Sequence, residues 1–341
     1  MKFYIYKRIR FIMFNTPILY IIFNRLDTVK QTFFTIKKIK PKYLYVAADG
    51  ARKNKLGEKE KCQEVRDWVL SQIDWNCELK TLFRDTNLGC GKGPADAISW
   101  FFSNVEQGII LEDDCLPADS FFQYCENLLN YYKDNPKVMH IAGFNCKRIT
   151  PIKNNVSYTF TAIQPVWGWA SWKDRWEKYS FIIDQNEIEK LKENHYFKKK
   201  YRQKYWFSKF KSNFNNISAW DFQWTYCILK NKGYCCVPVL NQIKNIGFGN
   251  DSSHSNKKDE KKFVLPTYEI LNIVHPEKIK FDEKLIKFTD KFVFNIHPLC
   301  MFPIYIKNIF KKLLKKIGIF DFIKRKVRRT HSDENTVTQL H

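Results

Sequence analysis

Gly108-Ile109-Ile110-Leu111-Glu112-Asp113-Asp114 joins an apolar run to three consecutive acidic residues. The apolar part predicts a buried β-strand, and the acids then fall at its carboxyl end, where open α/β sheets bind their ligands. Adjacent carboxylates repel one another and resist burial, so a fold keeps them together mainly where a cation lies between them. The stretch therefore predicts a site for a hard divalent cation, Mn²⁺ or Mg²⁺, with phosphate oxygens completing its coordination. A solvated acidic turn before a helix capped by Asp119 or Ser120 is the alternative.

Strand-like and helix-like segments alternate around this stretch. Apolar runs predict strands at 17–24, 43–48, 78–83, 109–111 and 138–142. Helical spacing of apolar residues predicts helices at 28–40, around 65–73, at 95–105 and at about 120–132. This alternation indicates an α/β fold with a doubly wound, largely parallel sheet. The tryptophan-rich segment 150–235 is predicted to form helices and loops beside that sheet.

The composition is that of a globular protein with a large core. The chain has 341 residues, 44% of them hydrophobic and 16% aromatic, which suits one large domain with an appendage. No apolar run approaches the roughly 18–20 residues of a membrane-spanning helix. The basic, aromatic N-terminus does not resemble a signal peptide, because charges interrupt it and no cleavage site follows. The ten cysteines include no CxxC pair, which favours a reducing cytoplasm over a disulfide framework.

The formal net charge of +23 predicts an anionic partner, with compositional bias as the alternative explanation. In the segment 300–341, apolar residues recur at helical spacing, lysines occupy the opposite face, and a further basic run follows. We therefore predict an amphipathic helix that binds the anionic cytoplasmic face of a membrane. A helix packed on the core is the alternative. We predict a basic N-terminal extension (1–15), a main domain (16–299) and a basic tail (300–341). Within the main domain, 16–145 would be the nucleotide-binding part and 146–299 the acceptor-side part.

The stretch Asn87-Leu88-Gly89-Cys90-Gly91-Lys92-Gly93 is rich in glycine and follows a predicted strand. It does not match the phosphate-binding GxxxxGK[ST] motif, and it does not follow the first strand as a dinucleotide fingerprint does. We expect it to approach a diphosphate with Arg84 or Lys92 nearby, or else to form a plain strand-to-helix turn. Asp49 ends another predicted strand, where it either accepts hydrogen bonds from a base or ribose or caps its own turn.

Two further stretches carry candidate catalytic side chains. Trp220-Asp221-Phe222-Gln223-Trp224 places one carboxylate among aromatic rings. An apolar setting raises the pKa of a carboxyl group, which suits a general base near neutral pH. An aspartate that begins a helix is the alternative. His254 follows the flexible stretch 247–253 and is either a ligand that swings in once nucleotide binds or a surface histidine with no role.

Four of these features occur in an order and with a spacing typical of one superfamily: Phe23-Asn24-Arg25, Asp49, Asn87-Leu88-Gly89 and Glu112-Asp113-Asp114. Together they resemble the GT-A fold glycosyltransferases, the nucleotide-diphospho-sugar transferases. The EDD form of the DxD motif is most similar to the inverting N-acetylglucosaminyltransferase I type, which has bacterial relatives among surface-polysaccharide enzymes. The resemblance covers roughly residues 16–255, and it implies a Rossmann-like GT-A sheet with an acceptor-side lobe.

The resemblance implies a role for each matching residue. Asp114 and His254 would bind the Mn²⁺ or Mg²⁺ ion that bridges the donor's phosphates, and Asp221 would deprotonate the acceptor hydroxyl. The residues that would hold the nucleotide-sugar are Phe23, Asn24, Arg25, Asp49, Arg84, Asn87, Gly89, Glu112 and Asp113. The wall between donor sugar and acceptor would consist of Trp167, Gly168, Trp169 and Trp220.

The implied activity is metal-dependent transfer of a hexosyl or N-acetylhexosaminyl group from a nucleotide-diphospho-sugar, most often a UDP-sugar. The acceptor would be a hydroxyl of a glycan or lipid-linked molecule, attacked with inversion during surface polysaccharide synthesis at the cytoplasmic face of the membrane. A sugar-phosphate nucleotidyltransferase shares the architecture, but it normally carries a long glycine-rich, basic signature after its first strand, where this chain has Phe23-Asn24-Arg25. A basic nucleic-acid-binding protein is the non-enzymatic alternative, although no nucleic acid partner is expected.

Overall fold

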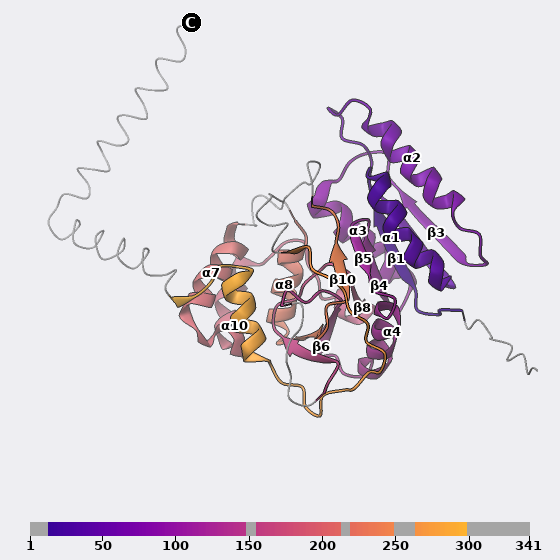
Figure 1. Cartoon of the computed structure of the whole chain (residues 1–341). Coiled ribbons are helices and arrows are strands. Elements are labelled where there is room, and N and C mark those ends of the chain that lie inside the picture. The colour runs from indigo at the N-terminus through magenta and orange to yellow at the C-terminus, as the bar shows by residue number, and fades with distance from the viewer. Residues whose placement is uncertain (1–12, 148–154, 213–218, 249–262, 299–341) are drawn as a thin grey trace, which may run out of the picture.

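The computed structural model describes residues 13–147, 155–212, 219–248 and 263–298 (Figure 1). The predicted basic tail, His254 and residues 1–12 of the N-terminal extension lie outside the described residues. The strands are β1 (Ile18–Ile22), β2 (Tyr43–Ala48), β3 (Glu78–Phe83), β4 (Gln107–Glu112), β5 (Cys115–Pro117), β6 (Val138–Ala142), β7 (Tyr158–Thr161), β8 (Trp169–Trp172), β9 (Tyr234–Pro238) and β10 (Ile243–Asn245).

A helix is the next element after β1, β2, β3, β5 and β8. The helices are α1 (Leu26–Ile39), α2 (Glu58–Ser71), α3 (Gly89–Asn104), α4 (Phe121–Tyr132), α5 (Lys173–Trp176), α6 (Gln185–Ile188), α7 (Lys200–Ser212), α8 (Asp221–Lys230) and α10 (Glu283–Phe292), with the 3₁₀ helices η1 (Glu189–Glu193) and η2 (His195–Lys198). Across the described ranges, no helix combines the length and apolar character needed to cross a membrane.

The central sheet has eight strands in the order β3-β2-β1-β4-β8-β6-β9-β7. The first four are parallel neighbours, while β8 and β7 run opposite to the rest. β5 and β10 pair antiparallel in a separate two-stranded sheet. This arrangement confirms the predicted α/β class with a mostly parallel sheet.

Helices cover both faces of the sheet, because the strand side chains alternate between two hydrophobic clusters. Ile18 and Tyr20 of β1 point into the cluster that contains Phe33 of α1, together with residues of α2 and α4. Leu19 points the opposite way, into the cluster that contains Phe101 of α3 and residues of α8. Alternation with a period of two is the property of an extended strand that buries both faces. The fold is therefore doubly wound, as predicted.

The prediction for segment 150–235 was wrong in one respect. The segment contributes whole strands to the sheet, and β8 lies near its centre, antiparallel to both β4 and β6. All four residues of β8 are buried, so their polarity does not alternate and the sequence carries no strand periodicity. The rest of the segment does form a helical lobe, in which α7 and α10 pack around a cluster that contains Trp206 and Phe210 (Figure 1).

A buried ion pair fastens α10 to this lobe. Arg202 Nε of α7 donates to Asp290 Oδ2 of α10 at 2.6 Å, and both side chains are at most 3% exposed. Tyr196 of η2 donates its hydroxyl to the other oxygen of Asp290 at 2.8 Å. Paired and hydrogen-bonded on both oxygens, the carboxylate is compensated inside the lobe, so the orientation of α10 is fixed.

His140 of β6 is a neutral histidine inside the core. Its Nε2 lies 2.9 Å from the carbonyl oxygen of Pro165, and its Nδ1 accepts a hydrogen bond from Trp224 Nε1 at 3.2 Å. The ring also stacks on Trp169, with centroids 4.9 Å apart. Burial lowers the pKa of His140 from 6.5 to about 3. An imidazole that donates through Nε2 and accepts through Nδ1 carries no charge.

We predict that His140 makes the fold sensitive to acid. The unfolded chain binds a proton below about pH 6.5, whereas the folded chain does not until about pH 3, so this stability is present above pH 6.5 and lost as the pH falls. Between pH 7 and pH 5 the loss in free energy of unfolding should be about 2 kcal/mol. Glu112 and Asp113 also titrate in this range, in both forms, so the loss should appear as the difference between wild type and His140→Gln when both are unfolded by urea at the two pH values. An NMR titration in which the wild-type ring protonates near pH 6.5 would contradict the prediction.

Candidate functional site

The carboxyl ends of β1, β2 and β4 lie side by side at one edge of the sheet. β1 pairs in parallel with both β2 and β4, and Ile21 lies opposite Glu112. The segments that follow these strands therefore emerge together: Phe23-Asn24-Arg25, Asp49 and Asp113-Asp114. Ligands of open α/β sheets bind at this edge.

Arg25 binds two of the three consecutive acids. Its Nη2 donates to Asp113 Oδ1 and, at 2.9 Å, to Asp114 Oδ2. Phe23 N donates to the other oxygen of Asp113 at 3.3 Å. Burial raises the pKa of Asp113 to about 6, and Arg25 opposes that shift. The side chain of Asp113 is 5% exposed and that of Asp114 is 16% exposed, so Asp114 is the more accessible of the pair.

Glu112 lies on the opposite face of the sheet from Asp113. Ile110, two residues earlier in β4, belongs to the cluster beneath α3 and α8, and alternate strand residues point the same way. Burial, and then the neighbouring charges of Asp114 and Asp113, raise the pKa of Glu112 to about 8. Asp221 at the start of α8 raises it further. Glu112 therefore lies within electrostatic range of both Asp114 and Asp221.

The acidic triplet has the donor chemistry of a Mg²⁺ or Mn²⁺ site. Carboxylate oxygens are the ligands these cations prefer, and here Asp113 and Asp114 share the single guanidinium of Arg25 while Glu112 has no ion pair with it. Asp114 fits a metal best because its carboxylate is the more exposed of the two that Arg25 binds. Among the described residues, no group of three or more His, Cys, Asp or Glu side chains is already arranged around a metal position. His254, the other predicted ligand, lies outside the described residues.

Gly247 packs directly against Asp114. It follows β10, and the preceding Ile246 N donates to the carbonyl oxygen of Asp114 at 2.8 Å. A Cβ atom on Gly247 would lie 2.2 Å from Asp114 Oδ2, closer than any side chain tolerates. Glycine therefore permits this contact, and no pattern in the sequence predicted it beyond a flexible stretch.

We predict that Gly247→Ala displaces the Asp114 carboxylate. Residues that orient a metal ligand typically change metal affinity by about 10–100-fold when altered, so Mn²⁺ affinity should fall by roughly that factor. Calorimetric titration of Mn²⁺ with a nucleoside diphosphate present measures it. Gly57→Ala is the control, because a Cβ there meets nothing within 4 Å, although its φ of +73° adds local strain. Unchanged Mn²⁺ affinity in Gly247→Ala would show that the contact with Asp114 does not matter.

Glu58 at the start of α2 forms an ion pair with Arg52 and also binds Asn24 of the segment after β1. Glu58 is 4% exposed, and Arg52 donates to it through Nη2 and through Nε at 2.9 Å. Asn24 Nδ2 also donates to Glu58 Oε1 at 3.0 Å, and the guanidinium of Arg52 lies 5.7 Å from the ring of Phe23. The sequence did not predict this pair, because Glu58 has the pattern of an ordinary charge at a helix start. It holds Phe23 and Asn24 beside the acidic triplet.

Asp49 binds the backbone at the start of α3. Its carboxylate accepts hydrogen bonds from the amides of Leu88 and Gly89, both at 2.9 Å, and of Gly50 at 3.0 Å. Asn87 Nδ2 donates to the carbonyl oxygen of Gly50 at 2.7 Å. Because α3 begins at Gly89, most of the glycine-rich stretch is helical and forms the strand-to-helix turn of the second alternative. Contacts of Asp49, Asn87 and Gly89 with a nucleotide stay predictions.

Arg84 is turned toward α3. Its Nη2 donates to Asp96 Oδ2 at 2.6 Å, and its carbonyl oxygen accepts from Arg66 Nη2 at 2.7 Å. Arg66 also donates to the carbonyl oxygen of Asp49 at 3.0 Å. Arg66 therefore joins the ends of β2 and β3, and no sequence motif pointed to it.

Asp221 begins α8 beside buried tryptophans. The ring of Trp220 stacks on Trp169, with centroids 5.6 Å apart. Gln164 Nε2 donates to the carbonyl oxygen of Asp221 at 3.2 Å and to Thr225 Oγ1 at 2.8 Å. These contacts fix the first turn of α8 and hold the Asp221 backbone in place. Trp169 pairs with Ile110 of β4, so that turn lies close to the strand that ends in Glu112.

Of the tryptophans predicted to form the aromatic wall, two are buried and only Trp167 is partly exposed. Trp169 is fully buried and Trp220 is 4% exposed, so both lie beneath the surface. Gly168, with φ +59°, turns the chain between Trp169 and the half-buried Trp167. The Trp167 ring contacts Phe248 and Phe263, with centroids 5.9 and 5.4 Å away. Phe248 follows Gly247, so these three rings lie next to the residue that packs on Asp114.

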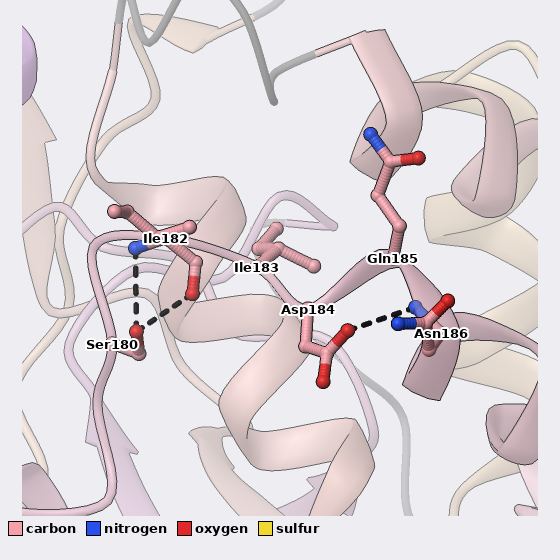
Figure 2. Close-up of a pocket in the computed structure, with 6 residues that line it drawn as sticks. All are labelled: Ser180, Ile182, Ile183, Asp184, Gln185 and Asn186. Atoms are coloured by element: carbon pink, nitrogen blue, oxygen red, sulfur yellow. Dashed lines mark hydrogen bonds between the residues drawn. The ribbon is translucent and has the colours of Figure 1, made fainter.

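A hollow elsewhere on the surface has no comparable chemistry. It is lined by Ser180 and by residues 182–186 of one short segment (Figure 2). Ser180 Oγ donates to the carbonyl oxygen of Ile182 at 2.6 Å, and Asp184 Oδ1 accepts from Asn186 N at 2.9 Å. Asp184, the acidic residue of this hollow, is thus the cap of α6, and we assign the hollow no catalytic role.

Comparison with known proteins gives no family. No family model matches the sequence, and no curated protein matches it. Partial structural similarity exists to HddC from Yersinia pseudotuberculosis (8% identity, 48% of this chain, 80% of that chain, TM-score 0.31). A putative glucose-1-phosphate thymidylyltransferase from Bacillus anthracis is also similar in part (11% identity, 60% of this chain, 85% of that chain, TM-score 0.29). So is an apo UDP-glucose pyrophosphorylase (7% identity, 67% of this chain, 91% of that chain, TM-score 0.31). The last two names describe nucleotidyl transfer, the enzymatic alternative above, and at these scores we base no argument on the similarity.

Proposed function

We propose that the chain is a metal-dependent glycosyltransferase that uses a nucleotide-diphospho-sugar, with UDP as the nucleotide. One observation carries the proposal: the acidic triplet lies at the sheet edge beside the first-strand segment, and Asp221 lies on the same side of β4 as Ile110, because Trp220 stacks on Trp169, the strand partner of Ile110. Glycosyl transfer to a hydroxyl needs a site for a cation and diphosphate next to a base. This edge supplies residues for both.

The donor would bind across the ends of β1, β2 and β4. Asp114 would hold the divalent cation, whose charge would offset the negative charge on the departing nucleoside diphosphate. Asp113 is fixed by Arg25 and Phe23 N, and it and Glu112 would orient the nucleotide from opposite faces of the strand end. The pocket for the base would be lined by Phe23, Asn24, Arg25 and Asp49.

The acceptor would approach from the side of α8. Asp221 would accept the proton of the attacking hydroxyl while the new bond to the anomeric carbon forms and the bond to the diphosphate oxygen breaks. A single displacement from the face opposite the leaving group inverts the anomeric configuration. Trp167, Phe248 and Phe263 offer ring faces on which a sugar can stack, next to Gly247 and Asp114.

Sugar-phosphate nucleotidyl transfer is the second candidate, because it needs the same mostly parallel sheet and the same metal-binding carboxylates at its edge. Its expected signature is a long glycine-rich loop after the first strand. Here β1 ends at Ile22 and α1 begins at Leu26, so only Phe23-Asn24-Arg25 lies between them, and that segment is occupied by Asp113 and Glu58. This short connection favours glycosyl transfer.

The reaction products distinguish these candidates. A thermal-shift screen of nucleotide sugars with Mn²⁺ first selects the donor, since a ligand that binds only the folded chain raises its stability. We then expect the full chain to release UDP from that UDP-sugar in an acceptor- and metal-dependent way. Release of pyrophosphate from a nucleoside triphosphate and a sugar 1-phosphate, without UDP-sugar turnover, would establish nucleotidyl transfer instead. Salt-sensitive nucleic acid binding that survives EDTA, with no turnover, would support the non-enzymatic alternative.

The acceptor is proposed to be a glycan or a lipid-linked molecule of surface polysaccharide synthesis. The basic segment 300–341 supports this proposal by its composition, since lysines opposite an apolar face suit an anionic membrane surface. The chain would then associate peripherally with the cytoplasmic face of the membrane.

A further inference from the structure

The outer face of α10 combines lysines with phenylalanines. Leu285, Ile286 and Asp290 are its buried residues. The positions at helical spacing on the other side are Lys284, Lys287, Phe288, Lys291 and Phe292. All three lysines are exposed, and Phe292 is 49% exposed although it is a large apolar side chain. Phe288 is half-buried, but neither it nor Phe292 belongs to a hydrophobic core cluster of the described residues, so their place on this face needs another explanation.

The two phenylalanines form one apolar strip with basic groups around it. The rings of Phe288 and Phe292 have centroids 4.6 Å apart. Lys291 Nζ lies 5.2 Å from the Phe292 ring centroid, and Lys147 Nζ lies 5.8 Å from that of Phe288. An apolar strip edged by cations is the composition of helices that lie in the headgroup region of a bilayer.

The acids of α10 and its cap are turned away from this face. Asp282 caps the helix by accepting from Lys284 N at 2.9 Å and Leu285 N at 3.0 Å. Glu283 lies 3.5 Å from His195 and 3.7 Å from Arg202, and Asp290 is buried against Arg202. Within the described ranges, Lys284, Lys287 and Lys291 have no ion pair with an acid, so the face presents positive charge only.

The neighbouring part of the lobe extends the charge. Lys198, Lys199, Lys200 and Lys204, at the junction of η2 and α7, are exposed and likewise form no ion pair within the described residues. α7 and α10 lie side by side at one end of the molecule, joined through Arg202 and Asp290 (Figure 1). Both neighbouring helices therefore expose unpaired lysines at this end of the molecule, and α10 adds the phenylalanine strip.

We propose that this surface of α10 and α7 binds the anionic headgroups of a phospholipid bilayer, with Phe292 inserted among them. Charge complementarity decides between occupants. The chain's own segment 300–341 is rich in lysine and arginine, so like charges oppose its docking on this face. A dissolved polyanion would satisfy the lysines but would leave the phenylalanine strip in water. The folded domain itself thus makes a membrane contact that does not depend on the predicted tail helix.

Co-sedimentation of the full chain with vesicles tests the proposal without any substrate. The vesicles contain phosphatidylcholine alone or with phosphatidylglycerol. Each lysine near an anionic surface changes affinity roughly fivefold, so Lys287→Gln with Lys291→Gln should weaken binding to the anionic vesicles roughly 25-fold. Phe292→Ala should weaken it about tenfold through lost apolar burial. Neutral vesicles should bind all forms weakly.

Matched substitutions at the other end of the molecule are the controls. Lys30→Gln with Lys59→Gln removes the same charge from exposed positions of α1 and α2, and Phe34→Ala removes a phenylalanine that is 68% exposed (Figure 1). These forms should bind vesicles like the wild type. Equal losses in the control and α10 variants, or none in either, would overturn the proposal. So would a Phe292→Ala form that binds vesicles normally while the lysine variant loses vesicles and single-stranded DNA alike, since that pattern belongs to a polyanion site.

Discussion

Asp114→Asn is expected to lower UDP-sugar turnover by a factor on the order of 10³ or more. Stabilisation of the leaving diphosphate by a bound metal ion contributes several kcal/mol to such reactions, and about 4 kcal/mol corresponds to that factor. Asp114 is the acid best suited to hold the ion, because Asp113 is more deeply buried and is held by both Arg25 and Phe23 N. Release of UDP at saturating Mn²⁺ measures the effect, and EDTA should reduce wild-type turnover in the same way.

Folding must be separated from chemistry in that experiment. Asp114 is one of the charges that raise the pKa values of Glu112 and Asp113, so removing its charge relieves repulsion. We therefore expect the melting temperature of Asp114→Asn to match or exceed that of the wild type. Asp119→Asn is the control, because its side chain is 61% exposed and pairs with Lys38 on the surface. Turnover that persists in Asp114→Asn, or that falls equally in Asp119→Asn, would show the metal assignment to be wrong.

The sheet edge could be predicted because its signals are local. The run Tyr43–Ala48 and the run Glu78–Phe83 are β2 and β3 with the bounds the sequence indicated. Parallel strands joined by helices bring their carboxyl ends to one edge, so the meeting of Arg25 with Asp113 and Asp114 followed from strand order.

The groups that sequence reasoning missed all depend on tertiary partners. Gly247 contacts Asp114 only because β10 pairs with β5, a short antiparallel pair without a clear pattern in the sequence. Glu58 is buried only because Arg52 and Asn24 converge on it. The strand β8 was missed since complete burial removes the alternation that identifies strands. Because Trp169 belongs to this buried strand, it lies in the core rather than on the predicted wall.

Asp221→Asn is expected to lower transfer by about 10²–10⁴-fold, the usual contribution of a general base. Its position supports that role, since the first turn of α8 is held by Gln164 and by the stack of Trp220 on Trp169. Asparagine has the same shape but accepts no proton. The maximal rate should therefore fall while the dissociation constant of the UDP-sugar stays within about twofold of the wild-type value. The measurements are initial rates with acceptor and a donor titration without it.

The donor titration determines what a loss of activity means. If Asp221 were only a residue that begins a helix, its replacement would loosen α8 and, through Glu112, disturb the donor side of the site. Donor affinity and melting temperature would then fall together with the rate. Asp134→Asn, at an exposed position just after α4, gives the size of an unrelated change. A selective fall in the maximal rate at constant donor affinity thus places the role of Asp221 on the acceptor side, where a general base must act, and rules out a residue that only begins the helix.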